Sequence, residues 1–360
     1  MSEDVNLEHM LDVFISIDVN SASVWCACIS FMRHLSWHKP RLVVLGPKVE
    51  GLPDNHPSKP ECLFQLAELF GSVGNRMEGK RLLTHGLKLW GGQGNNLWVA
   101  QALYSISDAN RLLGLWKEGI PQAEEAMENF KQFNHIHGQA KSWQLLALLF
   151  QADDQLDAAE QAASQAINLL QDKGEEFGVC QCYRILGDIY HSRNEIEKAI
   201  SHFETALRIG SSFNLSYHLF WSHHSLAQLF SEQGRFNDAH AHIECAKPHA
   251  INDTYLLGHV TELQAVCWYK ECKFKEAKSA ALYAADIYER SGATKDLEYC
   301  RATLQKIEMG LGSSCKFPDT VLLPIPINSP FPATHSTSTR HNFTSRFRHI
   351  LPHPPRSVPR

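Results

Sequence analysis

The sequence predicts an all-α solenoid of about six helical hairpins, followed by a capping helix and a disordered tail. Three observations lead to this prediction. Apolar residues recur at helical spacing in paired segments, most clearly over 182–191 and 196–209. Small residues return about every forty residues in the same register. Gly, Asn or Asp, which tolerate left-handed backbone, stand between the paired segments.

Three columns of small side chains set this register across six units. They are Ala67, Ser107, Ala147, Gly187, Ala227 and Ala265; Gly79, Gly119, Ala159, Ala199, Ala239 and Ala277; and Gly86, Ala126, Ala166, Ala206, Ala246 and Ala284. Two helix backbones approach closely only where the side chains between them are small, and larger neighbours fill the remaining space. Leu186, Tyr190 and Phe203 are such neighbours in the fourth unit. The constant period therefore predicts stacked hairpins.

Residues 1–57 do not follow the register. We expect short helices over 5–15 and 24–35, an extended stretch over 38–47 and a loop over 54–57. This segment either covers the exposed apolar face of the first hairpin or belongs to a structure further upstream.

The hairpins themselves are expected between residues 58 and 292. The first and weakest occupies 58–93, units two to five occupy 97–249, and the sixth runs over 254–292. Turns within hairpins are expected at Gly114, Asp153-Asp154, Asn194 and Gly234, links between units at Gly138, Gly174 and Gly210, and an early helix end at Pro248. Units of this length exceed the usual repeat of about 34 residues, so their helices or links should be longer by about a turn.

The segment after the sixth unit should be a capping helix, and 58–309 is then the complete array. Leu297, Cys300, Leu304 and Ile307 form one apolar stripe among charged residues, as expected for a helix that covers the last hairpin. Residues 310–360 are rich in Pro, Ser, Thr, His and Arg, and carry six basic residues against one acid. They predict a disordered tail.

Composition excludes several classes of protein. The hydrophobic fraction of 44% and charged fraction of 20% are typical of globular proteins, and a net charge of −5 does not indicate a nucleic-acid-binding protein. The acidic start over 1–4 is not typical of a secretory signal, and no apolar run is long enough to span a membrane. Ten scattered cysteines without a metal-binding spacing indicate free thiols, and we expect a cytoplasmic protein.

Two features suggest chemistry, but neither is complete. Residues 74–80 have the spacing of a phosphate-binding loop, but Arg81 follows where Ser or Thr is needed, and no strand precedes them. The twenty histidines include neighbours such as His240 and His242, which point to different faces of a helix. We therefore expect no catalytic residue, no metal ion, no cofactor and no small-molecule substrate.

The first helix of each unit should line the inner wall of the solenoid. Its side away from the packing columns carries polar residues and aromatics: Gln101, Tyr104, Asp108 and Arg111; Lys141, Gln144 and Gln151; Gln181, Arg184, Asp188 and His191; Trp221, His224 and Gln228; His259, Glu262 and Tyr269. Such a wall often binds peptides, although solubility alone also requires polar residues on an exposed helix side. Trp221 is the strongest indication, because a large aromatic there has no obvious packing role.

The hairpin over 181–209 resembles the tetratricopeptide repeat in its pattern of Leu186-Gly187, Tyr190, Ala199, Phe203 and Ala206. Over 58–309 the array is similar to the longer repeats of kinesin light chains and of adaptors for G-protein α subunits. The stretches GKRLLTH (79–85), SDANRLLG (107–114) and GRFNDAHAH (234–242) are similar to fungal proteins in which such arrays follow an NB-ARC or NACHT nucleotide-switch module. The resemblance implies a right-handed superhelix that senses and binds a partner.

That resemblance does not carry over every activity. The chain has no space for the nucleotide-switch module and no intact phosphate loop, so we expect at most a truncated or stand-alone relative of its sensor half. Chaperone-binding arrays need Lys and Asn on successive inner helices, where this sequence has Tyr104, Asp108 and Gln144.

The expected function is a non-enzymatic scaffold that binds a protein or peptide along the groove. Two alternatives remain open. The basic tail could tether the protein to nucleic acid or to an acidic membrane, although a solvated extension without selected structure is the simpler interpretation. An enzyme would need a deep pocket with converging ionisable groups.

Overall fold

The computed structural model describes residues 39–72, 75–91, 97–171, 173–251, 253–291 and 293–312. Within these ranges the secondary structure is helical and contains no strand, which confirms the all-α prediction. The helices are α3 (Lys39–Glu50), α4 (Lys59–Ser72), α5 (Arg76–Gly91), α6 (Leu97–Leu113), α7 (Trp116–Gln132), α8 (Ile136–Ala152), α9 (Leu156–Leu170), α10 (Glu176–Ser192), α11 (Ile196–Ser212), α12 (Ser216–Glu232), α13 (Phe236–Ala250), α14 (Thr254–Lys270), α15 (Phe274–Ser291) and α16 (Thr294–Gly312). The helices expected over 5–15 and 24–35 lie outside the described residues. The tail was expected over 310–360; residues 310–312 belong to α16 instead, and the rest of it lies outside the described residues.

The stretch over 38–47 was expected to be extended, and this prediction is wrong, because most of it belongs to α3. Leu45 and Val49, four residues apart, are fully buried in one cluster with the core of the first hairpin. Pro40 stands in the first helical turn, where its missing N–H costs little. α3 packs against α4 and therefore covers the first hairpin.

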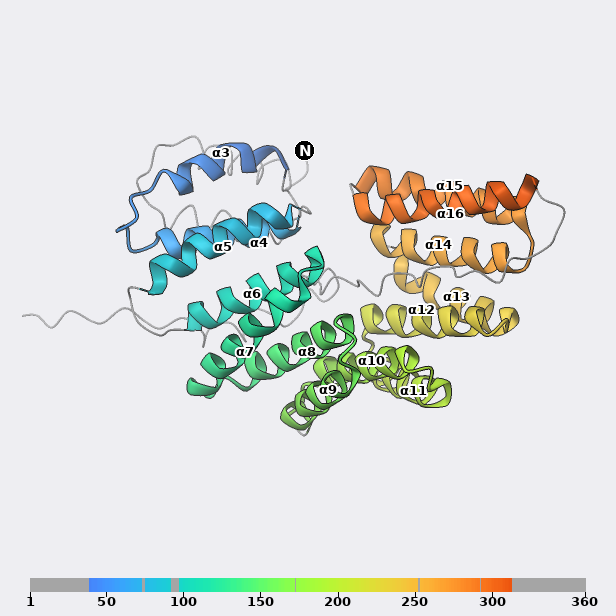
Figure 1. Cartoon of the computed structure of the whole chain (residues 1–360), viewed down its shortest axis with the longest axis horizontal. Coiled ribbons are helices and arrows are strands. Elements are labelled where there is room, and N and C mark those ends of the chain that lie inside the picture. The colour runs from blue at the N-terminus through green and yellow to red at the C-terminus, as the bar shows by residue number, and fades with distance from the viewer. Residues whose placement is uncertain are drawn as a thin grey trace, which may run out of the picture.

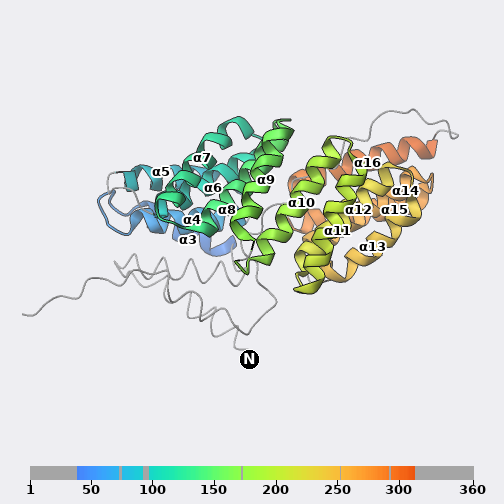
Figure 2. The same cartoon turned by 90° about the horizontal axis from the view of Figure 1, so that it is seen from below.

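Helices α4 to α15 pair into six hairpins at the predicted positions. Units one to six are α4 with α5, α6 with α7, α8 with α9, α10 with α11, α12 with α13, and α14 with α15. Figures 1 and 2 show these pairs side by side along the array. Helices α6, α7, α8, α10, α11, α12 and α14 are each 17 residues long. The extra length of each unit therefore lies in its helices.

The turns within hairpins use left-handed backbone at the predicted sites. The φ angle is positive at Gly114, Asp154, Asn194 and Gly234. Pro248, in contrast, does not end its helix early, because α13 continues to Ala250. The prediction of the turns is confirmed and that of the early helix end is wrong.

The links between units follow the prediction only in part. Gly174 has positive φ as expected, but Asn134 and Asn214 take this role in the other two links. Gly138 and Gly210 lie inside α8 and α11 instead. A Cβ atom on Gly138 would lie 2.4 Å from an aromatic ring of α7, so close packing explains this glycine better than turn geometry does.

The small columns lie where the two helices of a hairpin meet, and their residues are buried. Ser107 Oγ donates a hydrogen bond of 2.7 Å to the carbonyl oxygen of Gly119, which joins the first column to the second. A Cβ atom on Gly187 would lie 2.5 Å from the ring of Phe203. The register read from the sequence is therefore confirmed.

The array curves toward the first helices of its units. First helices of successive units touch one another, from α4 and α6 to α12 and α14, whereas no two second helices make a comparable contact within the described residues. The side on which neighbours are closer must be the inside of the bend. Figure 1 accordingly shows an open horseshoe, with α3–α8 on one arm and α12–α16 on the other.

The last helix, α16, covers the sixth hairpin as predicted. Cys300 and Ile307 are fully buried, and Leu297 and Leu304 pack beside them against the core formed by α14 and α15. The exposed side of α16 carries charged residues such as Glu298. The apolar stripe thus ends the stack without exposing its core.

Candidate functional site on the concave side

Several of the side chains expected to line a groove lie at the seams, the contacts between successive first helices. Ten are buried: Arg111, Gln144, Gln181, Arg184, Asp188, Trp221, His224, Gln228, His259 and Glu262. Gln101, Tyr104, Asp108, Lys141, Gln151, His191 and Tyr269 are half-buried. These ten buried side chains were expected to project into solvent. That expectation is wrong, because neighbouring helices approach closely enough for them to pack together. Whether any of the set binds a partner stays a prediction.

Two positions on the inner face recur in every unit from the second to the sixth. Six residues before the first small column lie Gln101, Lys141, Gln181, Trp221 and His259. Three residues before it lie Tyr104, Gln144, Arg184, His224 and Glu262. Neutral, basic and acidic side chains thus occupy equivalent places, so the units differ mainly in the chemistry that they place on the same wall.

The seam between α10 and α12 contains a buried ion pair. Arg184 Nη1 donates to Asp188 Oδ2 at 2.6 Å, and the two residues are only 3% and 2% exposed. Ser225 Oγ on α12 donates to Asp188 Oδ1 at 3.3 Å. Burial raises the pKa of Asp188, and the charge of Arg184 opposes that shift. The pair therefore links units four and five within a water-poor environment.

Other polar contacts also join residues about one repeat apart. Gln144 Nε2 on α8 donates to the carbonyl oxygen of Gly178 on α10 at 2.9 Å. His191 Nε2 lies 2.7 Å from Glu232 Oε2 across the next seam. Burial lowers the pKa of His191, but the hydrogen bond and charge of Glu232 outweigh this effect and raise it above its ordinary value.

The seam between α12 and α14 is aromatic. The ring of His259 lies 4.5 Å from that of Tyr255, 5.2 Å from Trp221, 5.7 Å from Tyr288 and 6.1 Å from His224. Trp221 therefore has a packing role, contrary to the expectation. Burial lowers the pKa of His224 to about 4 and that of His259 to about 3, so both rings are neutral at neutral pH. Neither Nε2 atom makes a hydrogen bond.

Glu262 lies one turn beyond His259 on α14. Burial raises the pKa of Glu262 to about 8, against the opposing effect of a 2.8 Å hydrogen bond that Tyr288 Oη donates to its Oε2. The carboxyl group is therefore protonated at neutral pH. Sequence reasoning missed Tyr288. The signal was available in the repeat register. Units four and five carry the small residues Gly210 and Ala250 at the position where unit six carries Tyr288.

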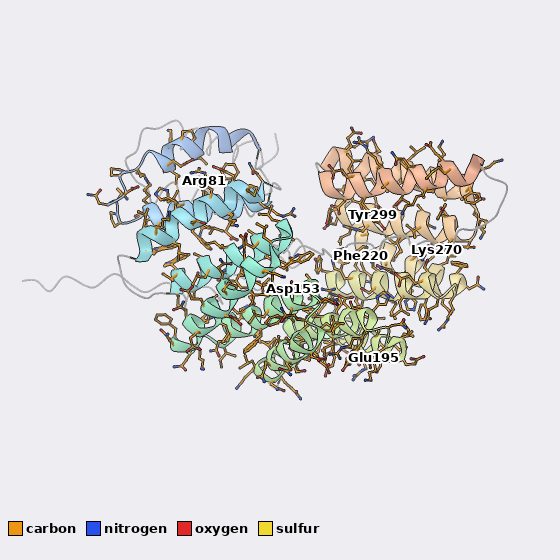
Figure 3. The ribbon with its side chains drawn as sticks, viewed as in Figure 1. Arg81, Asp153, Glu195, Phe220, Lys270 and Tyr299 are labelled. Atoms are coloured by element: carbon orange, nitrogen blue, oxygen red, sulfur yellow. The ribbon has the colours of Figure 1, made fainter. Side chains whose placement is uncertain are left out.

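The two arms of the horseshoe face each other across the concave side. Burial raises the pKa of Tyr217 on α12 to about 12, and the charge of Arg184 on α10, with a smaller effect from Arg111 on α6, opposes that shift. Burial also raises the pKa of Tyr255 on α14, and the charge of Arg76 on α5 opposes that shift. Side chains of units one and two thus act electrostatically on units five and six. Figure 3 places Tyr299 of α16 on the arm that also carries α12 and α14.

Three further findings concern metal binding, the phosphate-loop spacing and membrane spanning. No three or more His, Cys, Asp or Glu side chains among them are arranged to hold a metal ion. Gly79 and Lys80 lie inside α5, and Lys80 Nζ contacts Glu118 Oε2 at 3.3 Å, so a helix occupies most of the stretch with phosphate-loop spacing. None of the described helices has both the length and the apolar character needed to cross a membrane.

A family model described as Tetratricopeptide repeat matches residues 138–212 and 178–250, which include parts of units three to five. Residues 138–250 carry tetratricopeptide repeats. Units one, two and six continue the same hairpin arrangement outside the matched residues. No curated protein sequence matches the chain significantly.

Several solved tetratricopeptide-repeat structures share the fold. A Rap protein complexed with Competence and Sporulation Factor has a TM-score of 0.60 at 12% identity, over 85% of this chain and 91% of that one. Aspartyl phosphate phosphatase F from Bacillus subtilis has a TM-score of 0.54 at 13% identity, over 88% and 91%. A signal-transduction ATPase with a tetratricopeptide repeat sensor from Pyrococcus horikoshii has a TM-score of 0.52 at 14% identity, over 84% of this chain but only 47% of that one. At such identities the likeness concerns the fold alone.

Proposed function

We propose that this protein is a non-enzymatic scaffold that binds a segment of a partner protein along the concave side of its repeats. The observation that carries this proposal is the inner wall itself. Polar, charged and aromatic side chains recur there in register, and charges from units one and two act on tyrosines of units five and six. A polypeptide laid between the arms would contact both at once.

The comparisons support a role in sensing a partner. The Rap protein was solved in complex with a factor, and the Pyrococcus horikoshii relative uses its repeats as a sensor. From the likeness to that sensor we propose that this chain is related to the sensor half of a signal-transducing NTPase. From its free cysteines we propose that it acts in the cytoplasm.

The test is capture of a partner by the full chain through chemical crosslinking. The capture is then repeated with a variant that is changed on the concave side. Lys141→Glu on α8 changes a half-buried inner residue, and Glu197→Lys changes an exposed residue of α11 as a matched control. We expect Lys141→Glu to weaken capture at least tenfold and Glu197→Lys to leave it unchanged, with both variants melting like the wild type. Equal loss in both variants, or none in either, would contradict binding on the concave side.

A further inference from the structure

Two imidazole rings face each other between the helices of unit five. His223 on α12 and His242 on α13 place their Nδ1 atoms 2.9 Å apart, with ring centroids 5.2 Å apart. One of these nitrogens carries a proton and donates it to the other. Both side chains are half-buried, whereas His218, His224 and His259 are buried. Solvent therefore reaches this pair of rings.

Both rings are neutral at neutral pH. Burial lowers the pKa of His223 to about 4, and the charges of His242 and His249 lower it further. Burial also lowers the pKa of His242. A neutral imidazole keeps the lone pair that a metal ion needs, so protons do not compete for these nitrogens at neutral pH.

The packing of unit five holds the pair in place. The ring of His242 stacks on that of Phe230, with centroids 5.4 Å apart and an angle of 26° between the planes. Phe230 is buried and belongs to the core that joins units four and five. Side chains that are already ordered lose little conformational freedom when a ligand binds.

Negative charges lie near the pair. Asp238, one turn before His242 on α13, and Glu204 on α11 both raise the pKa of His242 against the effect of burial. Asp238 also pairs with Arg235 at 2.6 Å, whereas Glu204 is exposed on the neighbouring unit. Their combined charge favours a cation at the rings.

The separation of the two nitrogens suits one metal ion. Two nitrogen ligands about 2.0–2.1 Å from an ion and at a right angle to each other are about 2.9 Å apart. The Nδ1 atoms of His223 and His242 have this separation. Right-angled nitrogen ligands are typical of Cu²⁺ and Ni²⁺, whereas tetrahedral Zn²⁺ requires about 3.3 Å. Because the two lone pairs point at each other, each ring must turn about its Cβ–Cγ bond to face the ion.

We propose that His223 and His242 bind a divalent copper or nickel ion through their Nδ1 atoms, with water in its remaining positions. The proton between the rings moves through solvent to Nε2 of its own ring, and two water ligands leave the ion. Two protein ligands agree with the finding that no three-residue metal cluster occurs among the described residues. The ion would join α12 to α13, and the inference does not rest on the proposed function.

The test begins with the full chain, freed of metal by a chelator and titrated with CuCl₂, NiCl₂ and ZnCl₂ at neutral pH. We expect one Cu²⁺ per chain in the tightest phase, and Zn²⁺ to bind more weakly. The electron paramagnetic resonance spectrum at one equivalent of Cu²⁺ should show two imidazole nitrogens. Because the ion binds only the folded site, it should also raise the melting temperature.

Two variants test the ligands separately. His223→Gln and His242→Gln each keep a polar side chain but remove one imidazole. Each should weaken the tightest phase by more than the about 10–100-fold that loss of an outer-shell partner of a metal ligand costs. Each should also remove one nitrogen from the spectrum. Melting of the metal-free variants, followed by circular dichroism, checks that they fold.

The matched control is His202→Gln on α11. His202 occupies in unit four the position of His242, but Tyr183 stands there in place of His223, with ring centroids 6.0 Å apart. This variant removes a histidine without removing a pair, and should bind Cu²⁺ like the wild type.

Three outcomes would overturn the proposal. The first is the absence of a tight phase in the wild type, or a spectrum with fewer than two imidazole nitrogens, which decides the matter even if both pair variants unfold. The second is equal binding by the wild type, His223→Gln and His242→Gln. The third is a loss in His202→Gln as large as in the pair variants.

Discussion

Units four and six place opposite charges at one register position and bury them in different ways. Arg184 in unit four has Asp188 four residues later as its ion-pair partner. Glu262 occupies the equivalent position in unit six, but Val266 stands where Asp188 would be. A buried charge without a partner is costly, so Glu262 stays protonated instead. The repeat thus tolerates either charge, provided that the charge is neutralised within the protein.

The same two units also differ in how their hairpins close. Unit four pairs Gly187 with Phe203, unit five pairs Ala227 with Ile243, and unit six pairs two alanines, Ala265 and Ala281, at the equivalent places. In units four and five, a smaller side chain on one helix faces a larger one on the other, so the combined volume at the crossing is similar. Unit six has two small side chains there instead.

The largest effect is expected from breaking the ion pair of unit four. Arg184→Met leaves Asp188 buried without its cation, and should lower the free energy of unfolding by about 3–5 kcal/mol in urea denaturation. Adding Asp188→Leu should recover most of the loss. Glu262→Gln should change stability little at pH 6, because the residue that it replaces is already neutral. A large loss of stability in Glu262→Gln at pH 6 would contradict the view that unit six buries a neutral group where unit four buries a charged one.

A smaller effect is expected at the hairpin crossing of unit four. Gly187→Ala puts a Cβ atom within 2.5 Å of Phe203, and overpacking should cost about 1–3 kcal/mol by the same measurement. The double variant with Phe203→Ile copies unit five and should regain part of this stability. Gly71→Ala, at a helical glycine with no atom within 4 Å of the new Cβ, is the control and should be neutral or slightly stabilising. Equal effects at Gly187 and Gly71 would contradict the proposed crossing.

The raised pKa of Glu262 in unit six should make the free energy of unfolding depend on pH. The unfolded chain loses the Glu262 proton near pH 4.5, whereas the folded protein keeps it to about 8. The stabilisation is therefore complete below the unfolded pKa and is lost as the pH rises toward 8. Between pH 6.5 and 7.5 this residue should remove up to about 1.4 kcal/mol, and Glu262→Gln should flatten the curve by that amount. Parallel curves for the two proteins would disprove the raised pKa.

The sequence was sufficient for the fold but not for the environment of the inner wall. Recurring small residues mark contacts within a hairpin. The positions of Gly187 and Ala199 therefore predicted the two helices correctly. The burial of Trp221 and Arg184 depends on how closely neighbouring units approach, which no single repeat encodes. The helix α3 was missed because its two prolines suggested extended chain, while the decisive contact was with another helix.

The reach of the seam contacts has a consequence for biosynthesis. Gln144 with Cys182, Asp188 with Ser225 and His191 with Glu232 join residues 37–41 positions apart, so each unit can dock as soon as the next has left the ribosome. Glu262 is an exception in timing, because its surroundings include residues of α16, the last helix described. Its buried carboxyl group would reach its final environment only after α16 has been synthesised.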